Sequence, residues 1–445
     1  MRTTSLTTLS GALVCAGLSA CPPPPGACDP SGTGSITLAF SGLPAGVTPT
    51  VTLRGPSEQT VTMDQTLTVG SGNWVVTAEL ATASDPVVRT VYAGRVSAPS
   101  FCLRPGAAQT VDVAFEKVPT SNRLWVGNGA GGTGNLHGFD SAALRAAGAA
   151  ASSWKGVVAA SRVPAFDREG NVWALGATVS DPHVARLPAA AFATGGAVTP
   201  DRRVRITRLT CIPALAALAF DASGNLYVGS SCQKEVYRLS ASALAGATGT
   251  SDVVVEPALT LGGFTSVDGL AFDAAGNLYV GDAEAEQVVR YDAAALTGST
   301  ATASTRLKVR RTTMPADTSA FGPRALAFDR SGTLWSFDFG ANLLFSVSAT
   351  DLAGAGTRPV QPGVRVTLPV SSVLEGLAFD EGGGLWLPGA AGQVARLTPE
   401  QLTVSTGPGA PTTPERVIRG SDLGSAADPA FFPAPKGLPL FHALP

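Results

Sequence analysis

Short runs in which apolar and polar residues alternate cover the chain from about residue 31 to residue 118. Examples are SITLAFSGL from Ser35, QTVTMDQTLTV from Gln59 and QTVDVAF from Gln109. Period-two alternation of β-branched residues, interrupted by Gly and Pro turns, is typical of antiparallel strands that bury one face. The pattern predicts a small β-sandwich over residues 31–118, and nothing in it has catalytic spacing.

A longer pattern recurs from Pro119 to Pro445, in which an apolar strand, a Phe-Asp step, a turn with Gly and a second apolar strand follow one another. The copies are VPAFDREGNVWALG from Val163, LAALAFDASGNLYVGS from Leu215, VDGLAFDAAGNLYVGD from Val267, PRALAFDRSGTLWSFD from Pro323 and LEGLAFDEGGGLWLPG from Leu374. Their Asp residues lie 54, 52, 56 and 51 positions apart. A repeat of this length with about four strands per copy is typical of a β-propeller blade.

A second marker, a strand that ends in a run of small residues, follows each copy. It occurs as FDSAAL from Phe139, LPAAAF from Leu187, LSASAL from Leu239, YDAAAL from Tyr291, VSATDL from Val347 and LTPEQL from Leu397. The sixth copy of the first marker has a weak counterpart in PAFFPAPKGLPLF from Pro429, where Phe432 replaces the Asp. The offset predicts a blade whose first strand comes from the C-terminal segment and whose other strands come from residues after Pro119.

We therefore predict an all-β chain, with a small β-sandwich over residues 31–118 and a six-bladed β-propeller over residues 119–445, closed by its N- and C-terminal segments. A seventh blade formed near Leu440 is the alternative. The LAFDxxGNLYVGD pattern resembles NHL-type propeller repeats and, more loosely, the regucalcin/gluconolactonase family of six-bladed propellers. The sandwich resembles immunoglobulin-like or prealbumin-like modules. Propellers of this kind serve as lyases, lactonases, dehydrogenases and binding scaffolds, so the resemblance implies a fold and not an activity.

The repeated Asp residues are predicted to build turns. In FDAAGN, Asp273 can accept backbone N–H groups and Gly276 can take a positive φ. The same frame holds Asp167, Asp221, Asp329 and Asp380. Because a catalytic residue has no reason to recur in every blade, we assign these carboxylates a structural role.

Residues four positions before each repeated Phe are the better candidates for a functional site. First strands of blades line the central channel, and their leading ends open at one mouth. The residues at that position are Arg162, Ala216, Asp268, Arg324, Glu375 and, less directly, Ala427 beside Asp428.

Three interpretations of the mouth remain open. In gluconolactonase-like proteins a Glu, an Asn and an Asp hold a divalent cation, and the resemblance implies Asp268 and Glu375 as metal ligands here. Arg324 stands between them and no Asn matches, so the favoured expectation is that Arg324 pairs with both carboxylates and lowers their pKa values. In the third interpretation, Arg162 and Arg324 face each other across the axis and receive an anionic ligand.

Other chemistries lack their signatures. The sequence has no G-x-S-x-G, H-E-x-x-H, P-loop or dinucleotide-binding motif. A quinone-type dehydrogenase would suit the fold size, but no cofactor residues are recognisable. We expect no cofactor, apart from the divalent cation considered above.

The N-terminus resembles a bacterial lipoprotein signal. Residues 1–20 form a mildly apolar segment that ends in Leu-Ser-Ala, and Cys21 would carry the lipid. The PPPP run in residues 21–30 predicts an extended tether. Pro22 is not the acidic residue that would suggest inner-membrane retention, so outer-membrane sorting is favoured, with the membrane as a partner through the lipid.

Charge and cysteine content indicate which partners and which cross-links the chain can have. The formal net charge is -2 and 14% of residues are charged, which gives no electrostatic footprint for nucleic acid. Once Cys15 leaves with the signal and Cys21 is lipidated, four cysteines remain, and chain order favours disulfides Cys28–Cys102 and Cys211–Cys232. A zinc site is disfavoured because there is no C-x-x-C pair and only three His.

The sequence thus predicts a cell-envelope lipoprotein that displays a β-propeller as a scaffold for a protein, glycan or small-molecule ligand, with no catalytic set. A metal-dependent lactonase or hydrolase that uses the propeller mouth is the alternative.

Overall fold

The structure is a computed structural model that describes residues 28, 30–128, 134–146, 148–158, 164–175, 182–211, 216–247, 249–311, 320–369, 376–389, 392–420, 423–424 and 426–438. The chain divides into two compact units. The smaller consists of Met1–Ser41, Pro49–Glu79 and Arg95–Ala114, and the larger of Gly42–Thr48, Leu80–Gly94 and Phe115–Pro445. Among the described residues, no helix is long and apolar enough to cross a membrane.

Two sheets form the N-terminal part, with strand orders β4-β1-β9-β7-β6 and β3-β2-β5-β8. The strands are β1 Thr33–Ser41, β2 Val51–Arg54, β3 Glu58–Val61, β4 Gln65–Gly70, β5 Gly72–Ala78, β6 Ala81–Ser84, β7 Arg89–Val96, β8 Ser100–Leu103 and β9 Ala108–Lys117. Alternate residues are buried, as the period-two pattern predicts; Trp74 and Val76 of β5 and Val111 and Val113 of β9 are examples.

Six further sheets follow in the described part of the larger unit, each built on four antiparallel strands. Sheet I contains β37 Ala426–Phe432, β10 Arg123–Asn128, β11 Gly134–Asp140 and β13 Trp154–Val158. Sheet II contains β14 Ala165–Phe166, β15 Val172–Leu175, β16 Val184–Leu187 and β18 Arg202–Ile206. Sheet III contains β19 Ala216–Phe220, β20 Leu226–Ser230, β21 Glu235–Leu239 and β23 Leu259–Leu261.

The second half of the larger unit repeats this plan. Sheet IV contains β24 Gly269–Phe272, β25 Leu278–Asp282, β26 Gln287–Tyr291 and β27 Thr305–Val309. Sheet V contains β28 Pro323–Phe328, β29 Leu334–Asp338, β30 Leu343–Val347 and β32 Arg365–Thr367. Sheet VI contains β33 Ala378–Phe379, β34 Leu385–Gly389, β35 Gln393–Leu397 and β36 Arg416–Arg419.

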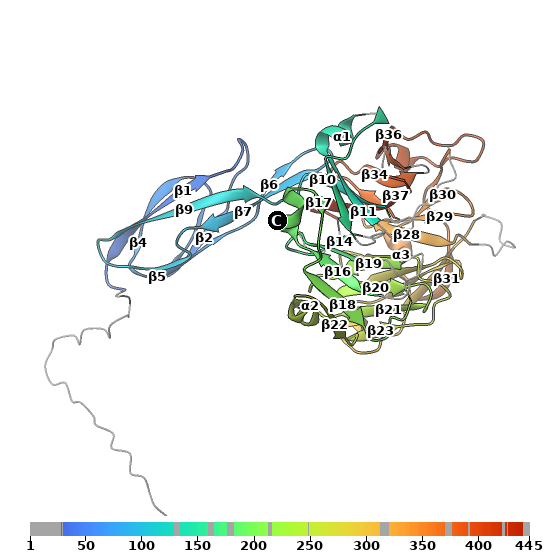
Figure 1. The fold of residues 1–445 in the computed structure, drawn as a ribbon, viewed down its shortest axis with the longest axis horizontal. Coiled ribbons are helices and arrows are strands. Elements are labelled where there is room, and N and C mark those ends of the chain that lie inside the picture. The colour runs from blue at the N-terminus through green and yellow to red at the C-terminus, as the bar shows by residue number, and fades with distance from the viewer. Residues whose placement is uncertain are drawn as a thin grey trace, which may run out of the picture. The chain divides into compact units, whose positions relative to one another are not determined.

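The first strands of the six sheets form a ring. Contacts run from β14 to β19, β24, β28, β33 and β37 in turn. The Phe166 and Phe432 rings, whose centroids are 5.1 Å apart, complete the circle between sheets II and I. First strands around a common axis define a β-propeller, and Figure 1 shows the short strands of the larger unit gathered in this way. The predicted β-propeller is therefore confirmed.

Sheet I combines residues from both ends of the repeat region. Strand β37 pairs antiparallel with β10, so that Phe432 lies opposite Arg123 and Ala430 opposite Trp125. The alternative of a seventh blade near Leu440 falls outside the described residues.

The second markers form short helical turns. They are α1 Ser141–Arg145, η1 Ala189–Ala193, α2 Ala241–Gly246, η2 Ala295–Thr297, α3 Ala349–Leu352 and η3 Gln401–Thr403. A buried side chain of each turn packs inward, such as Leu144 in α1 and Leu244 in α2. Arginines of the preceding sheet donate to backbone carbonyls of five such residues: Arg123 to Phe192, Arg202 to Leu244, Arg238 to Leu296, Arg290 to Leu352 and Arg416 to Leu144.

Linker strands join neighbouring sheets as well. Each pairs in parallel with the fourth strand of the preceding sheet. These strands are β12 Gly148–Ala149 on β36, β17 Gly196–Ala197 on β13, β22 Gly249–Val255 on β18 and β31 Gly356–Val360 on β27. These linker strands therefore join four of the six neighbouring pairs of described sheets by backbone hydrogen bonds in addition to apolar packing.

The Phe-Asp turn explains why the repeat carries an Asp. Asp273 accepts the backbone N–H groups of Ala275 and Asn277, both at 2.9 Å, and the Asn277 amide at 2.8 Å. Gly276 has a φ of +81°, which a residue with a Cβ adopts only under strain. Equivalent bonds to backbone N–H groups hold Asp167, Asp221, Asp329 and Asp380.

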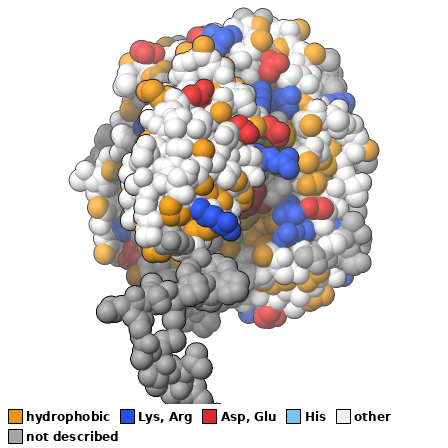
Figure 2. Space-filling view, turned by 90° about the vertical axis from the view of Figure 1, so that its left-hand side faces the viewer, with side chains coloured by type: hydrophobic (Ala, Val, Ile, Leu, Met, Phe, Trp, Pro, Cys, Tyr) orange, Lys and Arg blue, Asp and Glu red, His pale blue; other side chains and the backbone are white. Residues whose placement is uncertain are grey.

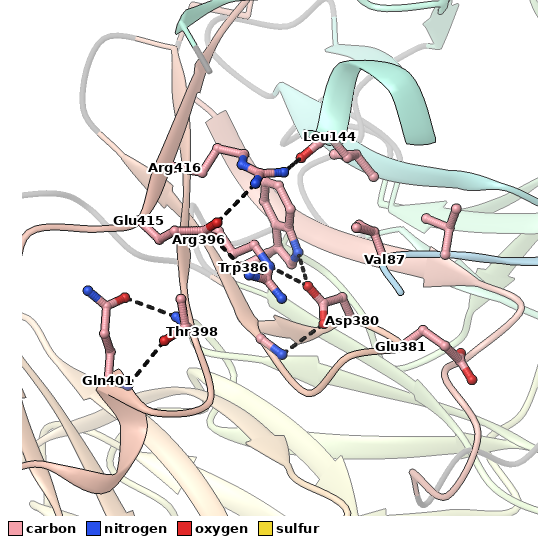
Figure 3. A network of polar contacts seen from close by, with 12 residues as sticks. Val87, Leu144, Asp380, Glu381, Trp386, Arg396, Thr398, Gln401, Glu415 and Arg416 are labelled. Carbon is pink, nitrogen blue, oxygen red and sulfur yellow. Dashed lines mark hydrogen bonds and ion pairs between the residues drawn. The ribbon is translucent and has the colours of Figure 1, made fainter. Parts of the chain in front are cut away.

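At Asp380 the turn becomes part of a charged network (Figure 3). Its side chain is fully buried and accepts bonds from Trp386 Nε1 at 2.9 Å and Arg396 Nε at 2.5 Å. Arg396 also pairs with Glu415 at 2.8 Å, and Glu415 with Arg416 at 2.9 Å. Since Arg416 donates to the Leu144 carbonyl at 2.6 Å, the network links the turn of sheet VI to the helical turn of sheet I.

Candidate functional site

The channel mouth of sheet IV is built where a first strand begins and a second strand ends. Asp268 precedes β24 and Asp282 ends β25, and antiparallel pairing brings them together because the Asp268 N–H donates to the Gly281 carbonyl at 2.9 Å. The Asp268 carboxylate accepts a hydrogen bond from the Ser266 hydroxyl and one from the Ala283 N–H at 3.1 Å. Asp268 is thus held in place by its own hairpin.

Asp282 holds the segment that carries Ser266, the hydrogen-bond donor to Asp268. It is fully buried and accepts the backbone N–H groups of Thr265 at 3.1 Å and Ser266 at 2.9 Å, together with the Gln287 amide at 3.0 Å. These bonds fix the segment that leads into β24. Asp282 and Ser266 were not among the predicted site residues, although the end of a second strand always lies beside the start of the first, and that spacing was available from the repeat.

The electrostatics of Asp268 correct the sequence prediction. Burial raises the pKa of the Asp268 carboxyl above its ordinary value, and the nearby Asp282 charge acts in the same direction. Hydrogen bonds from Ser266 and Ala283 and the charge of Arg324 oppose this rise without cancelling it. We predicted a lowered pKa from pairing with Arg324; desolvation outweighs that attraction.

Arg324 takes a different partner from the one expected. Its guanidinium carbon lies 4.9 Å from the centroid of the Phe339 ring, whose side chain is 41% exposed at the turn after β29. Within the part of the chain that the structure describes, Arg324 makes no ion pair with Asp268. Arg162 and Glu375 fall outside the described residues, so the anion-binding and metal-binding interpretations that depend on them stay predictions.

Asp428 is the second carboxylate of the mouth. It lies within β37, between the paired residues Ala426 and Pro429 where the register with β10 shifts, and is 9% exposed, as is Asp268. A Cβ added to Gly376 would lie 2.0 Å from Asp428 Oδ1, so the glycine of Leu-Glu-Gly makes room for this carboxylate. Its position was less clear from the sequence because the sixth copy of the repeat is degenerate.

Two cavities follow one another along the axis. The outer one, of about 120 Å³, contains Asp268 and Asp428 together with Gly269, Gly376 and apolar residues. The inner one, of about 220 Å³, is lined by the first strands of all six sheets. The two share Leu218, Leu270, Leu326 and Leu377, so they form a continuous path into the channel.

The described residues hold no group of three or more His, Cys, Asp or Glu side chains with the arrangement of a metal site. Asp268 and Asp428 with the carboxylate of Asp282 behind them do not form such a group. The charged side chains on the face shown in Figure 2 are of both signs and lie next to one another, in keeping with the low net charge.

Both predicted disulfides are confirmed. Cys28 is bonded to Cys102 of β8, and Cys211 to Cys232. Cys211 lies before β19 and Cys232 lies in the turn after β20, so the second bridge joins two segments at the mouth end of sheet III. The proposed lipid site, Cys21, lies outside the described residues.

No protein-family model matches the chain, and no curated protein matches it. Among solved structures, it is similar to virginiamycin B lyase from Staphylococcus aureus, with 10% identity, a TM-score of 0.38 and coverage of 63% of this chain and 82% of that one. A streptogramin B lyase structure has 11% identity and a TM-score of 0.38, covering 65% and 85%. The Cps50 (Swd1) β-propeller domain of Myceliophthora thermophila has 12% identity and a TM-score of 0.39, covering 58% and 71%.

Proposed function

We propose that this protein is a bacterial cell-envelope lipoprotein whose six-bladed propeller binds a small ligand at the channel mouth. In this proposal each of the six sheets is one blade, the two N-terminal sheets form a sandwich that serves as a spacer, and Cys21 carries the lipid. The observation that carries the binding role is the continuous path from the Asp268 and Asp428 carboxylates into the channel. Ligand sites are concave, mostly apolar and provided with a few polar groups, and this path has those properties.

The envelope location is supported by two features of the chain. The Leu-Ser-Ala-Cys order precedes a proline run, and the folded part holds two disulfides, which persist in oxidising compartments. Anchoring is tested by expressing the full chain and Cys21→Ser in a bacterial host and separating membranes from soluble fractions. Recovery of both proteins in the same fraction would refute the lipid anchor; release of the variant alone is expected.

The binding role is tested by filling the channel. Ala271 and Ala327 both line the inner cavity, and Ala271→Leu with Ala327→Leu would occupy much of it, whereas Ala271→Ser preserves its volume. We expect at least one compound in a panel of amines, carboxylates, sugars and divalent cations to raise the melting temperature of the unmodified chain and of Ala271→Ser but not of the filled variant. If no compound distinguishes these proteins, the channel is not a ligand site.

A further inference from the structure

The channel has an unusually uniform wall. Each first strand contains an alanine that is preceded by Leu or Pro and followed by Phe. The six alanines are Ala165, Ala219, Ala271, Ala327, Ala378 and Ala430. Each is partly exposed, while the flanking Phe residues are buried between sheets, so the alanine methyl groups face the channel.

This wall leaves an apolar space of defined size. All lining residues among those described are Ala, Leu, Phe or Pro, and the volume is about 220 Å³. An engineered apolar cavity of about 150 Å³ remains dry and binds benzene. The channel is therefore large enough for one aromatic ring or a short branched alkyl group, and the lining side chains offer such a group only apolar contacts.

The far end of the channel is narrowed by the chain itself. Strand β37 passes Asp428 at the mouth and ends at Phe432, and the turn that follows contributes Pro435 and Leu438 to the cavity wall. These residues come after β37, so they lie away from the mouth. A bound molecule would place its apolar part toward this turn and any polar group toward Asp268 and Asp428.

Among the described residues, the charged side chains that line the outer cavity are the two carboxylates Asp268 and Asp428, which favour a positively charged ligand group. Asp268 belongs to sheet IV and Asp428 to sheet I, which are three steps apart in the ring of six described sheets and hence face each other across the axis. Ser266 and the buried Asp282 stand behind Asp268, and the guanidinium of Arg324 stacks on Phe339. Gly269 and Gly376 allow close packing at the mouth, because added Cβ atoms would meet the Arg324 carbonyl oxygen at 2.1 Å and Asp428 Oδ1 at 2.0 Å.

From the apolar channel and its facing carboxylates, we propose that the ligand is a small amphiphilic amine, whose ammonium group binds between Asp268 and Asp428 and whose single ring or alkyl body fills the alanine-lined channel. The inference rests on the proposed binding function and adds the chemical class of the ligand. A charge-assisted hydrogen bond to a carboxylate is about twice as strong as a neutral one, so the head group decides the affinity.

The test uses calorimetric titration of the full chain with three probes of similar shape: 2-phenylethylammonium, propylbenzene and 3-phenylpropanoate. We expect the ammonium to bind at least about tenfold more tightly than propylbenzene, and the carboxylate not to bind. Asp268→Asn and, separately, Asp428→Asn should each weaken ammonium binding by about tenfold and leave propylbenzene unchanged. Ala271→Leu with Ala327→Leu should abolish binding of both, and Ala271→Ser should retain it.

Each contrary result has its own meaning. Equal affinity for the ammonium and propylbenzene, or tighter binding of the carboxylate, refutes the amine class while the channel stays a ligand site. Binding that survives the filled variant places the ligand elsewhere and overturns the inference and the proposed function together. Silence from all three probes, when sugars or cations in the broader panel still stabilise the chain, refutes the inference alone. The comparison of probes on the unmodified chain holds even if a variant fails to fold.

Discussion

The two ends of strand β24 carry the same kind of residue in opposite circumstances. Asp273, after the strand, occurs in a frame that five sheets share, and its oxygens accept two backbone N–H groups and the Asn277 amide. Asp268, before the strand, has no acidic counterpart at the same position of the described sheets II, III and V, and borders a cavity. The carboxylate that recurs in five copies builds the turn, whereas Asp268 borders a cavity.

This contrast has a physical basis in how the charge of each carboxylate is balanced. At the turns, backbone and side-chain donors of one hairpin surround the Asp, and at Asp380 Arg396 of β35 adds a further donor. At the mouth, two donors from the hairpin are not sufficient to offset burial, and the pKa of Asp268 rises. A cationic ligand would supply the missing compensation.

The largest effect is expected where a turn carboxylate is also buried in an ion pair. Asp380→Ala removes the partner of Gly384, Trp386 and Arg396 and should lower the free energy of unfolding by about 3 to 5 kcal/mol. Asp329→Ala is the control, because Asp329 is more exposed and pairs with no arginine among the described residues, and should cost about 1 to 2 kcal/mol. Chemical denaturation of both variants measures the difference; equal losses would mean that the network of Figure 3 adds nothing.

The second-largest loss of stability is expected when the disulfide at the mouth end of sheet III is removed. Replacing Cys211 and Cys232 together by Ser removes a bridge with a sequence separation of 21 and should lower propeller stability by about 3 kcal/mol. Replacing Cys28 and Cys102 is the matched control, since that bridge lies in the N-terminal part. We expect it to leave the propeller transition in place, and a shift of the propeller transition in the control would show that the two parts unfold together.

The smallest change, and one of opposite sign, is expected at Asp268. Because its pKa in the folded protein is raised above the value of the unfolded chain, the folded state holds the proton more firmly, and stability falls as the pH rises through the folded pKa. Asp268→Asn removes this loss, so the variant should be slightly more stable than the unmodified chain at pH 7 and should lose that advantage at pH 3. Asp273→Asn should be less stable at pH 7. Melting curves of both variants at the two pH values test this expectation. If Asp268→Asn is destabilised at pH 7, Asp268 has a structural role like that of the turn residue Asp273.

The repeating parts of the fold were predictable because the residues that determine each hairpin are close together in the sequence. The Phe-Asp step, the Gly with positive φ and the alternation of apolar residues are decided within one hairpin, and the disulfides followed from order along the chain. The alanine wall of the channel was present in every copy, yet its meaning depends on the six strands meeting around one axis.

The orientation of Arg324 was not predictable in the same way. Its position before the strand correctly places it near the mouth, but the direction of the side chain depends on Phe339, which comes from a different hairpin turn. The pKa of Asp268 depends on how much solvent the neighbouring sheets exclude, and no local pattern encodes that quantity.

The pairing of β37 with β10 has a consequence for biosynthesis. Arg123 and Phe432, which lie opposite each other, are 309 positions apart, and the residues of sheets II to VI lie between them. During synthesis β10 emerges long before the last strand of the ring, and until then its backbone edge is open to solvent or to chaperones. A chain that is cut short before β37 lacks the first strand of sheet I, so ring closure separates chains synthesised through that strand from truncated ones.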